Sequence, residues 1–374
     1  MKIFSNFESG AIDVVKAESK DDIQLTIPND NQSEFYQWFH FRLESQVGEE
    51  HSIKLMNLAK SAYPEGWDNY RVAASYDREE WFRIPAEFDG DTMSFKVTPE
   101  HNSIYFAYFA PYSYGRHQDL IHHAQLHPEC TLETLGHTLD GNDMSLLTIG
   151  TPEPGKKIVW VIGRQHPGET MAEWFIEGLL TRLLDDEDSV GRTLLGNSVF
   201  YVVPNMNPDG SIRGHLRTNA IGVNLNREWA EPSMERSPEV FLVRQKMLET
   251  GIDMFLDVHG DEAIPYNFVA GSEGTPSYGE ERKALEDAFK SALMAITPEF
   301  QDEYGYDKDK PGEANLTVGS NWVAEQFDCL AYTVEMPFKD HDFAPDEDYG
   351  WSPQRSHQFG RDTLAAVNAV MGEL

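Results

Sequence analysis

The first part of the chain, up to about residue 110, alternates short apolar runs with turn-forming residues. Runs rich in β-branched and aromatic residues cover 23–27, 35–43 and 103–109, and helical periodicity is nearly absent. Such runs, bounded by turn formers, are typical of short strands. We therefore predict an antiparallel β-sandwich domain over residues 1–115.

The pattern changes after about residue 130. A hairpin is predicted over 134–150, around the turn-forming Asp140-Gly141-Asn142. Apolar strands then alternate with amphipathic helices. The strands are predicted at 157–162, 199–203, 252–258 and 329–334, and the helices at 168–184, 238–249, 278–296 and 352–371. This alternation predicts a mixed-sheet α/β/α domain over residues 116–374, with helices on both faces.

Polar side chains follow closely on four of these strands. They are His166, Asn205, His259 and Glu335. Ligand sites in layered α/β sheets lie beyond the carboxyl ends of the strands. The four residues are therefore expected to meet at one edge of the sheet.

The chain has 63 acidic against 30 basic residues, and its formal net charge is −33. A charge of this sign repels nucleic acid and anionic membranes, so neither is expected as a partner. No stretch reaches the roughly 18 apolar residues of a membrane span. Two cysteines and the absence of a secretory signal pattern favour a cytoplasmic protein. The sequence leaves the oligomeric state open.

The residues His166, Glu169 and His259 have the composition of a catalytic zinc site. His166 and Glu169 are placed around the start of the helix predicted at 168–184, with Pro167 in its first turn. Residues three apart share a helix face, so both side chains can reach one ion. Two His and one Glu leave a fourth position open for water, and they also accept cobalt or nickel. The Asp261 and Glu262 carboxylates are candidate partners for His259.

Glu335 ends an apolar strand, where a carboxylate is costly unless it is paired or faces a polar cavity. Beside a metal it could take a proton from water. Arg217, Asn226 and Arg227 follow the turn-forming segment 205–210, in a chain with few arginines. A guanidinium can bind a carboxylate or stabilise an oxyanion. Structural ion pairs are an equal alternative for these arginines.

A second histidine-rich stretch runs from His117 through His122 and His123 to His127. Its spacing is compatible with a helix face, but such tracts are weak evidence for a metal site. A linker or an interdomain contact is the preferred interpretation.

The ordered motifs His-Pro-Gly-Glu (166–169), Asn-Pro-Asp-Gly (207–210), Arg-x8-Asn-Arg (217–227), Val-His-Gly (258–260) and a final Glu335 resemble the zinc metallocarboxypeptidases of the carboxypeptidase A type. The resemblance covers about residues 130–374. The segments 7–10, 36–39, 56–60 and 105–112 look like the N-terminal β-domain of the cytosolic carboxypeptidase subfamily.

The resemblance implies a role for each matching residue. His166, Glu169 and His259 match ligands of one Zn²⁺, and Glu335 matches the general base. Arg217 matches the residue that polarises the scissile carbonyl. Asn226 and Arg227 match the clamp on the C-terminal carboxylate of a peptide or protein substrate. The implied activity is removal of C-terminal residues, and the resemblance leaves open whether glutamate is one of them.

Two features depart from the family pattern. The substrate-capping tyrosine has two candidates, Tyr304 and Tyr306. The Gly-x-Gly-Arg segment, whose arginine binds a leaving glutamate, is replaced by Gly-Ser-Asn-Trp at 319–322. Lys308, Lys310 and Lys339 are candidates to replace that arginine. A zinc amidohydrolase acting on small N-acyl amino acids and a non-catalytic peptide-binding module are the alternative functions.

Overall fold

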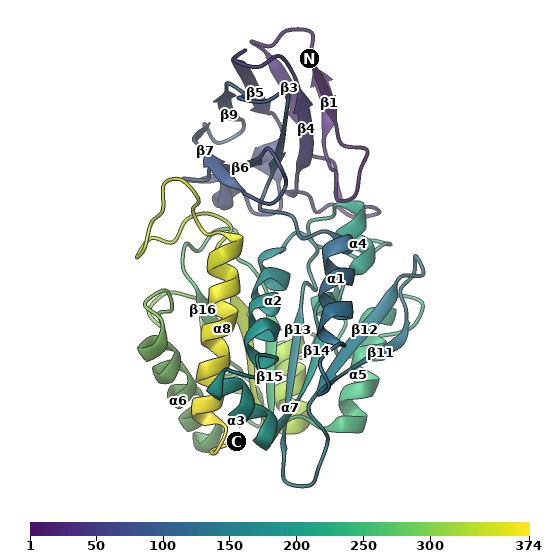
Figure 1. Cartoon of the computed structure of the whole chain (residues 1–374), viewed down its shortest axis with the longest axis vertical. Helices are drawn as coiled ribbons and strands as arrows, with labels where there is room; N and C mark the ends of the chain where they lie inside the picture. The colour runs from purple at the N-terminus through teal and green to yellow at the C-terminus, as the bar shows by residue number, and fades with distance from the viewer.

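The computed structural model describes all 374 residues. Its N-terminal region consists of two five-stranded sheets, and Figure 1 shows this region at one end of the molecule, next to the C-terminal region. One sheet has the order β1 (Lys2–Phe4), β4 (His40–Glu44), β10 (Ser103–Ala107), β6 (Val72–Ser75) and β7 (Phe82–Ile84). The other has the order β2 (Asp13–Lys16), β3 (Ile23–Thr26), β5 (His51–Leu55), β9 (Met93–Val97) and β8 (Ala86–Phe88). Every pair is antiparallel except β3 with β5, so the predicted antiparallel sandwich is confirmed in its architecture.

The strand expected at 35–43 is shorter than predicted, because β4 begins only at His40. The preceding residues bond to loops instead of to a neighbouring strand. The Phe35 carbonyl accepts from the Asp30 N–H, and the Tyr36 carbonyl accepts from the Ala62 N–H. Two short 3₁₀ turns, Leu58–Lys60 and Pro64–Trp67, are the helical elements of this region.

The C-terminal region is built on a seven-stranded mixed sheet. Its order is β11 (Cys130–His137), β12 (Asp143–Ile149), β14 (Ser198–Val203), β13 (Lys157–Gly163), β15 (Met254–Val258), β17 (Leu330–Glu335) and β16 (Phe268–Ala270). The four strands β14, β13, β15 and β17 are parallel, and the outer strands are antiparallel. The predicted hairpin and the predicted central strands are therefore confirmed.

Helices cover both faces of this sheet, and they include all four that the sequence predicts. They are α1 (Tyr114–Ala124), α2 (Met171–Leu183), α3 (Ser189–Asn197), α4 (Pro208–Arg213), α5 (Pro238–Thr250), α6 (Glu280–Ile296), α7 (Gly319–Phe327) and α8 (Pro353–Val370). Side chains of β13 alternate between two cores. Val159 and Val161 pack in the core shared with α2, α6 and α8, whereas Trp160 and Ile162 pack in the core shared with α5 and α7.

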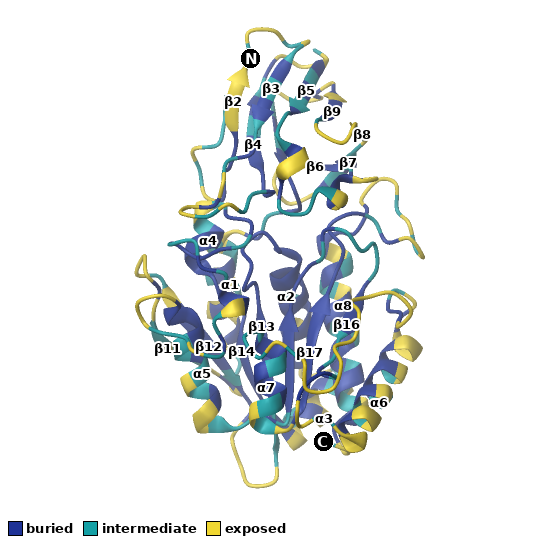
Figure 2. Cartoon of the chain, turned by 180° about the vertical axis from the view of Figure 1, so that it is seen from behind, coloured by how far each residue is buried: buried dark blue, intermediate teal, exposed yellow.

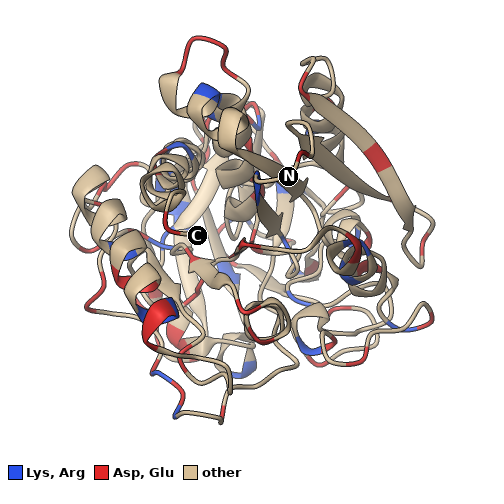
Figure 3. Cartoon of the chain, turned by 90° about the horizontal axis from the view of Figure 1, so that it is seen from below, with Lys and Arg blue, Asp and Glu red and all other residues tan.

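Helices α1, α3, α4 and α7 were not assigned from the sequence. Each has eleven residues or fewer, so few turns are available in which a 3.6-residue period could be recognised. Seen from behind, α2 is dark blue throughout most of its length, and the exposed residues lie mainly on outer helices and loops (Figure 2). No helix has the length and apolar character needed to cross a bilayer. Acidic residues are scattered over many loops and helices instead of forming one block (Figure 3).

Candidate active site

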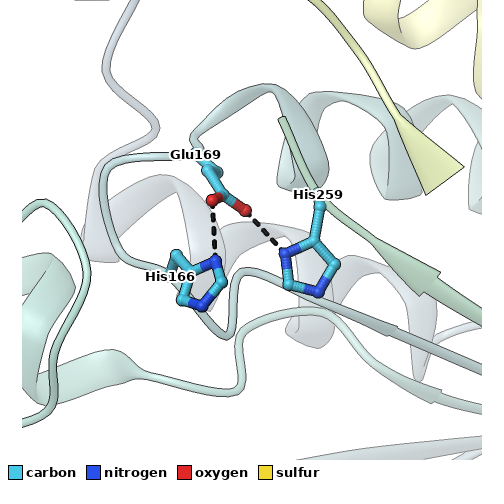
Figure 4. Close-up of side chains that lie close together, drawn as sticks. All are labelled: His166, Glu169 and His259. Atoms are coloured by element: carbon cyan, nitrogen blue, oxygen red, sulfur yellow. Dashed lines mark hydrogen bonds and ion pairs between the residues drawn. The ribbon is translucent and has the colours of Figure 1, made fainter. Parts of the chain in front are cut away.

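His166, Glu169 and His259 converge beyond the ends of β13 and β15, and their side chains face one another (Figure 4). Nδ1 of His166 lies 2.7 Å from one carboxylate oxygen of Glu169, and Nδ1 of His259 lies 2.7 Å from the other. The three ligand atoms lie within 4.8 Å of one another, and all three residues are buried. Two imidazole nitrogens and a carboxylate at this spacing are a donor set that fits a zinc ion.

The helix predicted at 168–184 begins later than expected, at Met171. His166 and Glu169 therefore lie on the turn that precedes α2, and Pro167 is not in the first helical turn. A long-range contact holds this turn, because the Gly168 N–H donates to the Leu216 carbonyl, 2.8 Å away. The turn still brings His166 and Glu169 together, with the Glu169 N–H bonding the His166 carbonyl.

A buried network holds this turn from behind. Arg164, which is 1% exposed, has a left-handed backbone conformation with φ 58°. Its guanidinium donates to the Pro167 and Tyr112 carbonyls and to the Glu173 carboxylate. Glu173 also accepts from His117 at 2.8 Å and from Asn205 at 3.1 Å. The backbone of the ligand turn is thus bonded directly to a fully buried ion pair.

The partner of His259 differs from the one expected. Nε2 of His259 lies 2.9 Å from Asp257, which precedes it on β15, although the two groups are not aligned as a hydrogen bond. Asp261 instead accepts from Tyr306 and from backbone N–H groups, so the expectation that Asp261 and Glu262 support His259 was wrong. The reason is directional: side chains two residues apart on a strand share a face, whereas the chain turns after His259.

All nine predicted site residues line one cavity of about 800 Å³. They come from loops and strand ends that are far apart in the sequence, and the N-terminal region adds Tyr63 and Glu65 to the wall. The set comprises His166, Glu169, Arg217, Asn226, Arg227, His259, Tyr304, Tyr306 and Glu335.

Glu335 lies at the end of β17, is 5% exposed and faces this cavity. One of its oxygens accepts from the Tyr306 hydroxyl at 3.1 Å, and the other has no hydrogen-bond partner. The same hydroxyl lies 2.8 Å from Asp261 and has a single proton, so it donates to one of the two carboxylates at a time. Tyr304 points elsewhere, because its ring stacks on Tyr266 at 4.6 Å between centroids. Of the two tyrosine candidates, Tyr306 alone contacts Glu335.

Arg217 and Arg227 form no ion pair with any carboxylate, in contrast to Arg213, which pairs with Asp140. The Arg217 guanidinium lies over the rings of Phe35 and Tyr63, at 5.6 and 5.5 Å. Structural ion pairing, the alternative considered from the sequence, therefore does not account for these two arginines. They are cations available to a ligand in a strongly acidic protein.

Burial and neighbouring charges shift the pKa values of the site. Burial, reinforced by the Arg217 charge, lowers the pKa of His166 to about 4, so its imidazole is neutral. Burial raises the pKa of Glu335 well above its ordinary value, and His259 partly opposes this rise. Burial disfavours protonated His259, but the Asp257 and Glu169 charges outweigh it and raise the His259 pKa. A bound cation competes with that proton.

The lysines considered for glutamate recognition differ in position. Lys308 lines the cavity and pairs with Glu273 at 2.8 Å. Lys339 donates to the Asp68 carbonyl, and neither it nor Lys310 lines the cavity. Lys290, which the sequence analysis did not single out, also lines the cavity and pairs with Asp302 at 2.8 Å.

The second histidine-rich stretch does not form a cluster. His117 bonds to Glu173, His122 bonds to the Gln118 carbonyl, and His127 lies 3.3 Å from Asp186. Each of these three histidines thus has a separate partner.

Several supporting residues were missed from the sequence. Asp257 carried a usable signal, because a carboxylate inside the buried strand Met254–Val258 needs a polar partner. Asn224, which lies 3.1 Å from Nε2 of His166, carried none. Asp30, in the N-terminal region, bonds to the backbone around Arg217, and no local pattern announces it.

Two family models match the chain. Residues 3–109 match the cytosolic carboxypeptidase N-terminal domain, and residues 117–358 match the zinc carboxypeptidase family. The fold and the site define a metallocarboxypeptidase. The chain belongs to the zinc carboxypeptidase family.

Solved structures extend the likeness over the whole chain. A metallo-carboxypeptidase from Burkholderia cenocepacia is 51% identical, with a TM-score of 0.96 and 98% of each chain covered. One from Pseudomonas aeruginosa, in complex with (2-guanidinoethylmercapto)succinic acid, is 45% identical, with a TM-score of 0.97 and full coverage of both chains. Cytosolic carboxypeptidase 6 of Mus musculus is 26% identical over 89% of this chain, which spans 66% of that protein.

Proposed function

We propose that this metallocarboxypeptidase is zinc-dependent and removes single residues from the C-termini of peptides or flexible protein tails. One observation carries the proposal. A three-donor metal set, a buried carboxylate with an unpartnered oxygen and two arginines without acidic partners line the same cavity. These are the components that hydrolysis of a terminal peptide bond requires.

His166, Glu169 and His259 would hold the zinc ion. Bound zinc polarises a carbonyl group and lowers the pKa of water. The neutral His166 imidazole is the form that ligates, and the Glu169 carboxylate supplies the negative charge that a divalent cation needs. The Asn224 side chain bonds Nε2 of His166 at 3.1 Å and so orients that ring, while the Asp257 carboxylate lies 2.9 Å from Nε2 of His259 as a charge partner.

Glu335 is proposed as the general base. Its unpartnered oxygen accepts the proton of the attacking water, and the same carboxyl then delivers that proton to the leaving amine. Its buried position supports this role, because burial raises its affinity for the transferred proton. The Tyr306 hydroxyl, bonded to the other oxygen, orients the carboxylate.

Arg217 is proposed to stabilise the negative charge that develops on the scissile carbonyl oxygen. Asn226 and Arg227 are proposed to bind the terminal carboxylate of the substrate, which makes the enzyme an exopeptidase. Asn226 is well anchored for this task, because its Oδ1 accepts from the Gly319 N–H at 2.8 Å and its amide nitrogen remains free to donate.

The charges of the cavity bear on which residue is released. Ten acidic and four Lys or Arg side chains line it. Lys290 and Lys308 are both paired with carboxylates, so a C-terminal glutamate has to compete with Asp302 and Glu273 for them. The ligand of the Pseudomonas aeruginosa relative carries a guanidino group as well as a succinic acid unit. Glutamate, arginine and lysine are therefore the three C-terminal residues to compare first.

The N-terminal region supports the choice of a small or flexible substrate. Tyr63 and Glu65 of this region form part of the cavity wall, and this wall is proposed to restrict the approach of a folded protein surface. A short peptide or an unstructured tail enters without that obstacle.

The test is hydrolysis of a panel of peptides that differ only in the C-terminal residue, with and without a chelator. We expect release of single C-terminal residues that stops on chelation and returns on addition of zinc. In the same panel, Glu335→Gln is expected to lose at least about 10³-fold in kcat while it keeps its metal content. Tyr304→Phe serves as a matched control on the cavity wall.

Other outcomes would support other functions. Release from N-acyl amino acids, but from no peptide, would support the zinc amidohydrolase. Peptide binding without turnover, unchanged in Glu335→Gln, would support a non-catalytic binding module.

A further inference from the structure

The loop that carries Arg217 has no regular secondary structure between Gly214 and Asn224. Its backbone N–H groups therefore need partners from elsewhere in the protein. Three consecutive N–H groups, those of Leu216, Arg217 and Thr218, point to one side chain of the N-terminal region, Asp30.

Asp30 is 4% exposed, and both of its carboxylate oxygens are used. Oδ1 accepts from the Leu216 N–H at 2.7 Å. Oδ2 accepts from the Arg217 N–H at 2.8 Å, from the Thr218 N–H at 2.9 Å and from the Thr218 hydroxyl at 3.0 Å. Hydrogen bonds to a buried carboxylate are stronger than neutral ones, so this contact fixes the backbone of the loop.

The same segment of the N-terminal region touches the loop at further points. The Asn31 side chain donates to the Ala220 carbonyl at 2.7 Å, and the Asn31 N–H donates to His215. Gly222 has φ +82°, and a Cβ there would lie 2.4 Å from the Gln32 carbonyl oxygen. The two segments are therefore in direct backbone contact.

The Arg217 side chain is held by the same region. Its guanidinium lies over the rings of Phe35 and Tyr63, both of which belong to the N-terminal region. A cation between aromatic faces is attracted by the ring quadrupoles and keeps its hydrogen-bond donors free at the edge. Backbone and side chain of Arg217 are thus both positioned from outside the catalytic sheet.

The loop also reaches the metal-ligand turn, because the Leu216 carbonyl accepts from the Gly168 N–H at 2.8 Å. Leu216 therefore bonds Asp30 through its N–H and the ligand turn through its carbonyl. Asp30 fixes the position of Arg217 relative to His166 and Glu169.

From these contacts we infer that Asp30 is a positioning residue for the reaction, and that the N-terminal region is a working part of the active site rather than only a cover over it. The inference rests on the proposed role of Arg217 in stabilising the oxyanion. A donor that is displaced by a fraction of an ångström loses much of its effect on the transition state.

The experiment is a double-mutant cycle on the full-length zinc enzyme with Asp30→Asn and Arg217→Ala. The nitrogen of the introduced amide cannot accept a hydrogen bond, so the loop loses part of its anchor. We expect Asp30→Asn to lower kcat about 10- to 100-fold with less than about a threefold change in KM. In the Arg217→Ala background, the same substitution is expected to lower kcat less than about twofold, because the group that it positions is gone.

Asp89→Asn is the matched control. Asp89 also accepts two backbone N–H bonds in a loop of the N-terminal region, but it is exposed and bonds only to Asp91 and Thr92. It is expected to retain wild-type kcat. Metal content and the folded fraction are measured for every variant, so that a loss of active protein is not counted as a loss of rate.

An equal loss of kcat from Asp30→Asn in both backgrounds would refute the inference, as would no loss in either. If Asp30→Asn does not fold, Thr218→Val takes its place in the double-mutant cycle, because it removes the hydroxyl that bonds Oδ2 of Asp30. Its kcat is expected to fall about threefold, and the same outcomes would refute the inference. Amide hydrogen exchange at 216–218 is expected to accelerate in the Asp30 variant, and unchanged exchange would show that Asp30 does not hold the loop.

The two proposals fail in different ways. A wild-type enzyme that releases no residue from any peptide would refute the proposed function before the cycle begins. An active wild-type enzyme with a fully active Arg217→Ala variant would refute the role of Arg217, and with it the positioning role of Asp30, while peptide hydrolysis itself stands.

Discussion

The buried ion pair behind the metal-ligand turn gives the sharpest prediction about stability. Arg164 and Glu173 are 1% and 0% exposed, and they are bonded to each other and to the turn. Arg164→Met keeps much of the side-chain volume but removes the cation. Glu173 is then a buried carboxylate that retains only His117 and Asn205 as partners.

The magnitude follows from what is left unpaired. Removing one member of a buried, hydrogen-bonded ion pair costs about 3–5 kcal/mol, because the remaining charge stays desolvated. The Pro167 and Tyr112 carbonyls also lose a donor. Since these losses overlap, we expect Arg164→Met to lower the free energy of unfolding by about 4 kcal/mol.

The assay is denaturant unfolding of metal-free protein, so that metal affinity does not enter the result. The double variant Arg164→Met/Glu173→Gln carries no uncompensated charge, and its loss is expected to be smaller than the sum of the single losses by about 2 kcal/mol. Arg236→Met is the control, since Arg236 forms an exposed pair with Glu228 and is expected to cost less than about 1 kcal/mol. A loss below about 1 kcal/mol for Arg164→Met, or additive losses in the double variant, would show that the pair does not hold the turn.

Two further predictions concern the site, and a third concerns the buried carboxyl group of Glu239. Zinc added to chelator-treated protein, at a free concentration about 100 times its Kd, is expected to raise the free energy of unfolding by about 2.7 kcal/mol. The shift is measured by thermal unfolding, and the same shift in His166→Ala would contradict the proposed ligand set. Tyr306→Phe is expected to lower kcat/KM about tenfold through loss of its bond to Glu335, whereas Tyr304→Phe should stay within about twofold; equal effects would remove the distinction between them. Burial raises the pKa of Glu239 from 4.5 to about 8, so the folded protein binds this proton more tightly than the unfolded chain does. This bound proton contributes fully to the free energy of unfolding below pH 4.5, and the contribution is lost as the pH rises through about 8, by at most about 5 kcal/mol. The free energy of unfolding is measured at about pH 5 and 9, and its pH dependence is expected to be weaker in Glu239→Gln.

Local patterns in the sequence were sufficient for the central architecture. The apolar strand over 157–162 and the strand before His259 appear where the composition predicts them, because a parallel strand buried on both faces must be apolar along its length. The convergence of His166, His259 and Glu335 followed from the same reasoning, since each ends one of the parallel strands.

Local patterns failed where a distant partner decides the conformation. The helix expected from residue 168 begins at Met171, and the turn before it is bonded through the Gly168 N–H to Leu216, which lies far along the chain. Phe35 to Phe39 have strand-forming composition, yet the first carbonyls of this run bond loop residues and β4 begins only at His40. In both places the backbone takes hydrogen-bond partners from distant segments, which local propensity does not indicate.

The sequence by itself was sufficient to predict the chemistry of the site, because the residue types of His166, Glu169, His259 and Glu335 and their order along the chain indicate a metal site with a nearby base. Only the tertiary structure decided how that chemistry is held. Asp30 lies 187 residues from Arg217. No sequence periodicity indicates that a loop of the N-terminal region contacts the loop that carries Arg217 in the C-terminal region. Such contacts form when the two regions pack against each other. The buried backbone N–H and C=O groups of each loop then need hydrogen-bond partners, and side chains of the other region supply them.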